Sequence, residues 1–120
     1  MCVQVRWEGT ELYNYSPLIY GYQLTDVAIT GGGIINGSGS VEFASWKALQ
    51  HADQELAREM GNSSVNVSAR VFGAGHYLRP QLIQMMGVTN LLIEGITLVD
   101  SPFWTVNPVY VRSHGSNPRP

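Results

Sequence analysis

One internal repeat limits the possible folds of this chain more than any other feature of its sequence. Residues 25–31 read Thr-Asp-Val-Ala-Ile-Thr-Gly, and residues 89–95 read Thr-Asn-Leu-Leu-Ile-Glu-Gly, which is an offset of 64 residues. Extending this offset in both directions pairs Leu18 with Leu82, Ile19 with Ile83, Leu24 with Val88, Ile34 with Leu98 and Asn36 with Asp100. The two regions are therefore predicted to be copies of one structural unit.

The repeated unit consists of short apolar runs that end at Gly, Asn, Asp or Pro. This pattern is typical of short strands separated by tight turns. Glycine, aspartate and asparagine suit the corners because they accept a left-handed backbone. The order strand, turn, strand, glycine turn, strand predicts an all-β chain, folded as part of a right-handed parallel β-helix. Apolar side chains of one coil would stack on those of the next, about 4.8 Å away.

The offset is too long for a single coil, which predicts an insertion over about residues 40–78. Within it, Ser45 is expected to cap a helix over about residues 46–60. The predicted apolar face of this helix is Trp46, Leu49, Ala52, Leu56 and Met60, and the predicted exposed acids are Asp53, Glu55 and Glu59. The coils are expected at about residues 13–37 and 79–112, as a fragment of one β-helix domain. Since so short a solenoid has two open ends, we infer that the chain is a segment of a longer protein.

Composition and charge argue against several classes of function. Charged residues are only 13% of the chain and the net charge is −2, so no basic surface is expected and nucleic acid is not a predicted partner. No apolar run approaches the roughly 20 residues that span a membrane, and the first residues do not resemble a signal peptide. The single cysteine, Cys2, and the well-separated His51, His76 and His114 do not predict a metal site.

The acidic residues do not form a recognisable catalytic pair. A glycosidase needs two carboxyl groups about 5–9.5 Å apart, yet the sequence contains no Asp-Asp pair. Asp100 is the best candidate for the rim of an active site, and the alternative is a turn before Ser101-Pro102. No catalytic residue is therefore assigned.

The segment 101–108 reads as a strand between two prolines. If Trp104 and Val106 face the core, then Phe103, Thr105 and Asn107 face outward. A hydroxyl and an amide beside an aromatic ring suit sugar binding, so Thr105 and Asn107 are the candidate substrate-binding residues. The alternative is an ordinary solvated strand.

Several stretches, taken in order over about residues 6–112, carry a resemblance to a known family. They are Arg6-Trp7-Glu8-Gly9, Leu12-Tyr13-Asn14-Tyr15-Ser16-Pro17-Leu18-Ile19-Tyr20, Asp26-Val27-Ala28-Ile29-Thr30-Gly31-Gly32-Gly33-Ile34-Ile35-Asn36-Gly37, Trp46, Val71-Phe72-Gly73 with Gly75-His76-Tyr77-Leu78-Arg79-Pro80, Asn90-Leu91-Leu92-Ile93-Glu94-Gly95 and Ser101-Pro102-Phe103-Trp104. Together these stretches resemble glycoside hydrolase family 28, the polygalacturonases and related pectin-degrading enzymes. The resemblance implies a right-handed parallel β-helix that hydrolyses α-1,4-galacturonosyl bonds of pectic polysaccharide or oligogalacturonide without metal or cofactor. It also implies a secreted or periplasmic protein.

The catalytic motifs of the family are Asn-Thr-Asp, Asp-Asp, Gly-His-Gly and Arg-x-Lys, and none of them occurs in this chain. His76 lies in Gly75-His76-Tyr77, so the catalytic role of the family histidine is not assigned to it. By resemblance, Thr105 and Asn107 would lie one rung from the first catalytic aspartate. The chain is therefore predicted to be the N-terminal part of a polygalacturonase-like hydrolase, and to be inactive alone. The alternative is a non-catalytic β-helix that binds carbohydrate or serves as a structural module.

Overall fold

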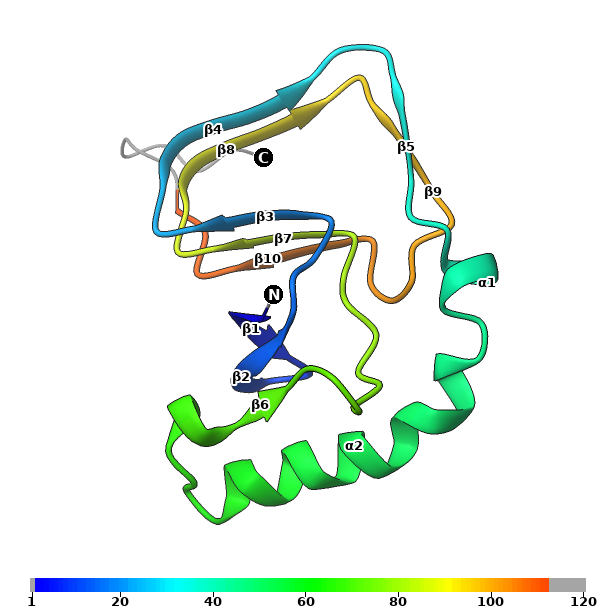
Figure 1. Ribbon diagram of the computed structural model, residues 1–120. Coiled ribbons are helices and arrows are strands. Elements are labelled where there is room, and N and C mark those ends of the chain that lie inside the picture. The colour runs from blue at the N-terminus through cyan, green and yellow to red at the C-terminus, as the bar shows by residue number, and fades with distance from the viewer. Residues whose placement is uncertain (1, 113–120) are drawn as a thin grey trace.

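The computed structural model describes residues 2–112 of the chain, drawn in colour in Figure 1. In chain order the elements are β1 (Cys2–Trp7), β2 (Thr10–Tyr15), β3 (Ile19–Tyr22), β4 (Thr25–Thr30), β5 (Ile34–Asn36), α1 (Gly39–Glu42), α2 (Trp46–Asn62), the 3-10 helix η1 (Val67–Ala69), β6 (Val71–Phe72), β7 (Ile83–Met86), β8 (Thr89–Glu94), β9 (Thr97–Val99) and β10 (Val106–Val109).

Three parallel sheets form the walls of a short tube, which Figure 1 shows along its axis. Strands β3, β4 and β5 make the first coil, β7, β8 and β9 make the second, and β10 begins a third. Ile19 lies opposite Ile83, and Ile83 lies opposite Val106 on the other side of β7. The predicted parallel β-helix is thus confirmed, and so is the offset of 64 for the strand pairs β3–β7 and β4–β8.

The third strand pair departs from the predicted register by one residue. Ile34 pairs with Thr97 and Asn36 pairs with Val99, so the expected partners Leu98 and Asp100 are wrong. The cause is the length of the preceding turn. Residues 31–33 separate β4 from β5, whereas only residues 95–96 separate β8 from β9.

The interior of the tube is apolar and its corners carry the residues that the sequence predicts. Leu82, Ile83, Met85 and Val88 are buried there, packed against Ile19, Val27, Ile29, Ile35, Leu91, Ile93 and Leu98. At one corner, Asp26 and Asn90 both have left-handed backbones, with φ of 58° and 62°. Asn90 Nδ2 donates to Asp26 Oδ1 at 2.8 Å, so this corner is linked by side chains from one coil to the next.

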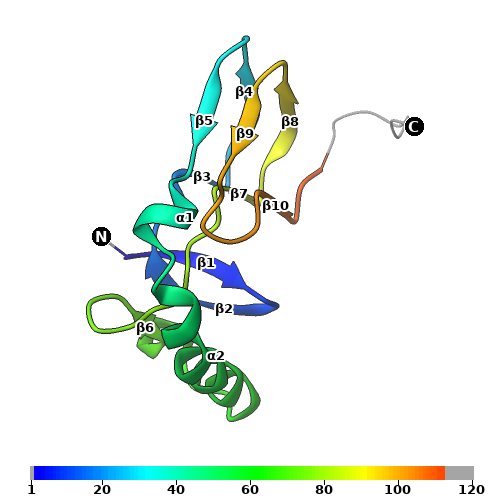
Figure 2. The ribbon, with the colours of Figure 1, turned by 90° about the vertical axis from the view of Figure 1, so that its right-hand side faces the viewer.

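A second sheet, β1-β2-β6, lies beside the β3-β7-β10 wall of the tube (Figures 1 and 2). We call it the N-terminal sheet. It encloses a separate core of Val5, Trp7, Leu12, Ala57, Phe72 and Leu78. Since Tyr13 and Asn14 belong to β2 of this sheet, the first coil begins at β3, and its expected start near residue 13 was too early.

Tyr20 links the N-terminal sheet to the tube, because its hydroxyl donates a hydrogen bond to the Gln4 carbonyl. Burial raises the pKa of Tyr20 to about 12.

The insertion contains the predicted helix, but the helix presents a different face. Helix α2 begins at Trp46 as expected and continues to Asn62, while the Ser45 side chain makes no capping hydrogen bond. Leu49 and Ala52 are exposed, so their expected place in the apolar face is wrong. The buried positions are Gln50, Asp53 and Ala57. Polar partners on the following loop, described below, explain why this side of the helix turns inward.

Candidate substrate-binding site

The segment that precedes β10 holds the tube against the N-terminal sheet. The Phe103 ring stacks on Trp7 with 4.8 Å between centroids and 5° between planes. The Arg79 guanidinium lies over the same Phe103 ring at 5.3 Å. Trp104 stacks on the Phe103 ring as well, but it is 50% exposed rather than in the core. The expected outward Phe103 is therefore part of a structural contact, and Trp104 is the ring open to solvent.

Asn107 points out of the tube but is not open to solvent. It pairs with Gln84, is 9% exposed, and its Oδ1 accepts from Gln84 Nε2 at 2.7 Å and from Gln81 Nε2 at 3.4 Å. Both glutamines also donate to the Arg6 carbonyl of β1, at 2.9 and 3.2 Å. The expectation of an exposed Asn107 is wrong because β1 covers this side of the wall.

Val106 and Thr105 complete the strand that the sequence singled out. Val106 lies opposite buried Ile83 in the parallel pair of β10 and β7, yet Val106 is 40% exposed. The reason is that β10 is the edge strand of this wall in residues 2–112, so no further strand covers it. The Thr105 side chain is exposed, and its backbone carbonyl accepts from the Ile83 N–H at 3.0 Å. The structure thus leaves Thr105 accessible and encloses Asn107, so the two do not form one open pair. Their contact with substrate stays a prediction.

The sequence missed a buried polar cluster that joins α2 to the loop after β6. Asp53, expected to be exposed, is buried. Its Oδ1 accepts from His76 Nδ1 at 2.6 Å and its Oδ2 accepts from the Tyr77 N–H at 2.8 Å. One turn earlier, Gln50 Oε1 accepts from the Arg79 N–H and Nε at 3.0 and 2.9 Å. These bonds fix the rotation of the helix and give His76 a structural role.

We predict that Asp53→Asn lowers the free energy of unfolding by about 1–3 kcal/mol, because one oxygen of a buried carboxylate, which accepts from a partly buried partner, is replaced by an NH₂ group. The control is Glu59→Gln, which makes the same chemical change at an exposed position of the same helix. Chemical denaturation of the two variants and the parent chain measures the difference. Equal losses for both variants would contradict the role given to Asp53.

Asp100, the acidic candidate for the rim of an active site, forms hydrogen bonds within the fold. Asp100 has a left-handed backbone, with φ of 50°, and its carboxylate accepts from the Ser40 N–H and hydroxyl at 3.0 and 2.8 Å. This arrangement supports the turn interpretation of Asp100.

Within residues 2–112, no three His, Cys, Asp or Glu side chains gather as metal ligands would, and His114 lies outside that range. No helix in the described part of the chain is long and apolar enough to span a bilayer.

Comparisons with known proteins agree with this geometry. A probable polygalacturonase of Vitis vinifera is 35% identical over 100 residues, which are 82% of this chain and 16% of that protein. The crystal structure of a hyperthermoactive exopolygalacturonase from Thermotoga maritima is similar with a TM-score of 0.87 and 37% identity, over 98% of this chain and 31% of the other. No family model matches the chain.

The parallel coils and their apolar interior define the class: a segment of a right-handed parallel β-helix. Within this class the chain belongs with the polygalacturonases, which confirms the resemblance to glycoside hydrolase family 28. The chain spans less than a third of the length of either relative, so it corresponds to a fragment of such a protein.

Proposed function

We propose that this chain provides the first coils and the N-terminal sheet of an enzyme that hydrolyses α-1,4-galacturonosyl bonds in pectic polysaccharide or oligogalacturonide. The observation that carries the proposal is the likeness to an exopolygalacturonase over 98% of the chain at 37% identity. The whole enzyme would be secreted or periplasmic, because its substrate is a polymer of the plant cell wall.

The chain alone is proposed to be non-catalytic. Hydrolysis needs a proton donor and a second carboxylate across the scissile bond. The carboxylates with the most partners here serve the fold: Asp53 binds the loop after β6, Asp100 binds Ser40, and Asp26 accepts from Asn90. The acid and base of the whole enzyme would then lie on coils beyond β10.

This proposal predicts no hydrolysis by the purified 120-residue chain. Incubation with polygalacturonate should release reducing ends no faster than the buffer, while an active polygalacturonase in a parallel reaction shows that the assay works. A clear rate that follows the concentration of the chain through purification would overturn the non-catalytic assignment.

A non-catalytic β-helix that binds carbohydrate or serves as a structural module is the second candidate. The structural use of Asp53, Asp100 and Asp26 fits this module as well as it fits a fragment of the hydrolase. The DNA downstream of codon 120 separates the two proposals. The hydrolase requires an Asn-Thr-Asp motif followed by an Asp-Asp pair on later coils, whereas a gene that lacks them supports the module.

A further inference from the structure

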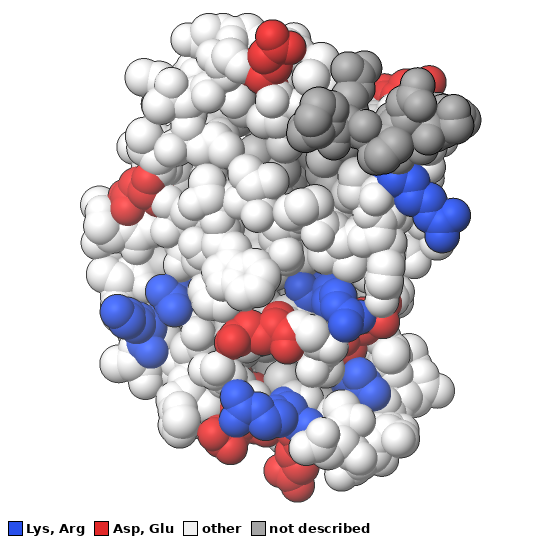
Figure 3. All heavy atoms as spheres, turned by 180° about the vertical axis from the view of Figure 1, so that it is seen from behind, with Lys and Arg blue, Asp and Glu red and all other residues white. Residues whose placement is uncertain are grey.

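A hollow lies between the β1–β2 turn and the C-terminal end of α2, away from the strand segment discussed above. Its lining includes Gly9, Thr10 and Glu11 from the hairpin, Arg58 and Gly61 from α2, and Arg70 from the residue before β6. Gly9 leaves space there, since a Cβ added at this position would meet no heavy atom within 4 Å. Figure 3 shows that charged side chains gather on the lower half of the rear face, which contains the N-terminal sheet and α2.

Arg70 is a buried cation that has only neutral acceptors. It is 9% exposed, its Nε donates to the Val65 carbonyl at 2.8 Å, and its Nη1 donates to the Glu11 carbonyl at 2.9 Å. In the described part of the chain, no carboxylate lies within 4.0 Å of its guanidinium. Buried charges in folded proteins are normally paired, because desolvation of an isolated ion is costly.

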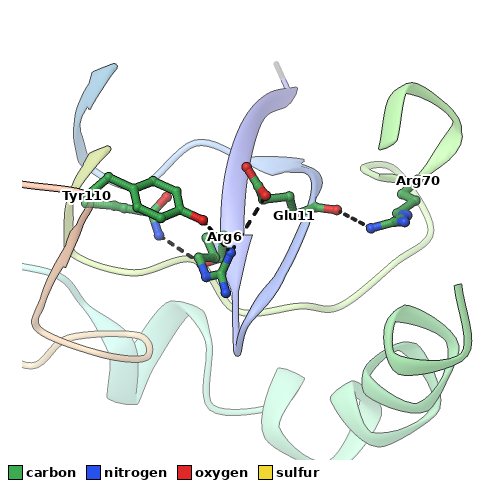
Figure 4. Close-up of polar contacts among 5 residues, drawn as sticks. Arg6, Glu11, Arg70 and Tyr110 are labelled. Carbon is green, nitrogen blue, oxygen red and sulfur yellow. Dashed lines mark hydrogen bonds and ion pairs between the residues drawn. The ribbon is translucent and has the colours of Figure 1, made fainter. Parts of the chain in front are cut away.

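The acidic residue that lines the hollow, Glu11, does not supply the missing charge. Figure 4 shows that Glu11 presents its backbone carbonyl to Arg70 and turns its carboxylate toward Arg6. That carboxylate forms an ion pair with Arg6 at 3.7 Å, and Arg6 also donates to the Tyr110 hydroxyl at 2.9 Å. The hollow is thus left with an excess of positive charge.

Arg58 adds a second cation to the same hollow. Its partner is Glu55 on the preceding turn, at 3.4 Å, and both side chains are more than half exposed. Exposed pairs of this kind contribute little, about 0–1 kcal/mol. The Arg58 guanidinium is therefore available to a stronger anionic partner.

A purely structural role for Arg70 accounts for only part of this arrangement. Its two bonds to carbonyls hold the loop after α2 against β2. A cation near the C-terminal end of α2 also interacts favourably with the partial negative charge at that end of the helix. These bonds use two of the five N–H donors of the guanidinium. They leave its charge without a counter-ion beside an open hollow.

We propose that this hollow binds a carboxylate, and that its ligand is a galacturonate unit of a pectic oligosaccharide. The choice of a uronate rests on the proposed function, whereas the anionic character of the ligand rests on Arg70 and Arg58. A planar guanidinium can hold a carboxylate through two parallel hydrogen bonds, which a neutral sugar cannot accept in the same way. The hollow would anchor the polymer at a distance from the bond that is cleaved.

The test is NMR of the arginine Nε–H groups in the 120-residue chain, titrated with trigalacturonate. Its methyl ester is the uncharged control ligand, and inorganic phosphate is a simple anion. Trigalacturonate should shift the Arg70 Nε–H signal saturably, and the methyl ester should not. Arg58→Gln should weaken binding roughly threefold to tenfold through the loss of one charged hydrogen-bonding partner. Lys47→Gln, which removes the same charge at an exposed site on α2, should leave the affinity unchanged.

Arg70→Lys provides a second variant, because it keeps the charge but loses the planar fork, and it should also weaken binding. An Arg70 signal that responds to none of the three ligands would overturn the site, as would equal binding of the ester or equal weakening by Lys47→Gln. Binding of phosphate without trigalacturonate would overturn the uronate assignment. It would not affect the hydrolase proposal, which the downstream gene sequence tests separately.

Discussion

Replacing Trp7 with alanine is expected to lower the free energy of unfolding by about 3–5 kcal/mol, the range measured when a large buried aromatic is truncated. Trp7 is 1% exposed and stacks on Phe103. Its Nε1 donates to the Arg79 carbonyl at 3.0 Å. The substitution would leave a cavity between the N-terminal sheet and the tube, and it would also leave that carbonyl without its donor. Guanidinium-induced unfolding, followed by far-ultraviolet circular dichroism, measures the change.

Trp104→Ala is the matched control for Trp7→Ala, since it removes the same side chain from the outer end of the same aromatic stack. Trp104 is 50% exposed and its ring lies 5.8 Å from that of Phe103. It should therefore cost no more than about 1.5 kcal/mol, the upper range for one aromatic pair. Similar losses at both positions would show that Trp7 does not hold the sheet to the tube.

Replacing Gly95 with alanine is expected to destabilise the chain by about 2–5 kcal/mol, from left-handed backbone strain and overpacking together. Gly95 has φ of +78°, which an L-residue adopts with strain. An added Cβ would also overlap the carbonyl oxygen of Gly31, which lies one coil away. Because both obstacles are backbone features, no side-chain rotation relieves them. Chemical denaturation gives the total loss, and amide hydrogen exchange should show the largest change in β8 and β9.

Gly32→Ala is the control for Gly95→Ala, because Gly32 lies in the equivalent turn of the first coil. A Cβ at Gly32 would meet no heavy atom within 4 Å, and its φ is outside the left-handed range. Its effect should stay within about 0.5 kcal/mol, as for an unconstrained surface site. If both substitutions were equally harmless, the close approach of the two turns would be disproved.

The pairing of residues between the two coils could be predicted from the sequence only where the corresponding turns of the two coils have equal length. The repeat aligned β3 with β7 and β4 with β8, because apolar and corner residues recur there at a constant offset. It failed at β5 and β9, where the turn at residues 31–33 is one residue longer than the turn at 95–96. An alignment of two repeats shows which strands correspond, but a change of turn length between them shifts every later pair.

The polar residues show where sequence reasoning stops. Alternation along β10 correctly indicated that Asn107 points out of the tube, but β1 covers it there, and β1 lies about a hundred residues earlier in the chain. Helical periodicity placed Asp53 on the exposed side, whereas the loop that carries His76 and Tyr77 packs on that side. Nothing in the sequence distinguishes Arg70 from an exposed arginine, and only the structure shows that it is buried.

The amino-acid sequence alone was sufficient to establish the coiled parallel architecture, because stacking of like residues and left-handed corners depend on short segments that recur. Only the tertiary structure decided which outward faces stay open, since this depends on how β1 packs against the wall of the tube and on how α2 packs against the N-terminal sheet. The same packing buries Arg70 and turns Glu11 toward Arg6, so the charge of the hollow arises from contacts between residues far apart in the chain.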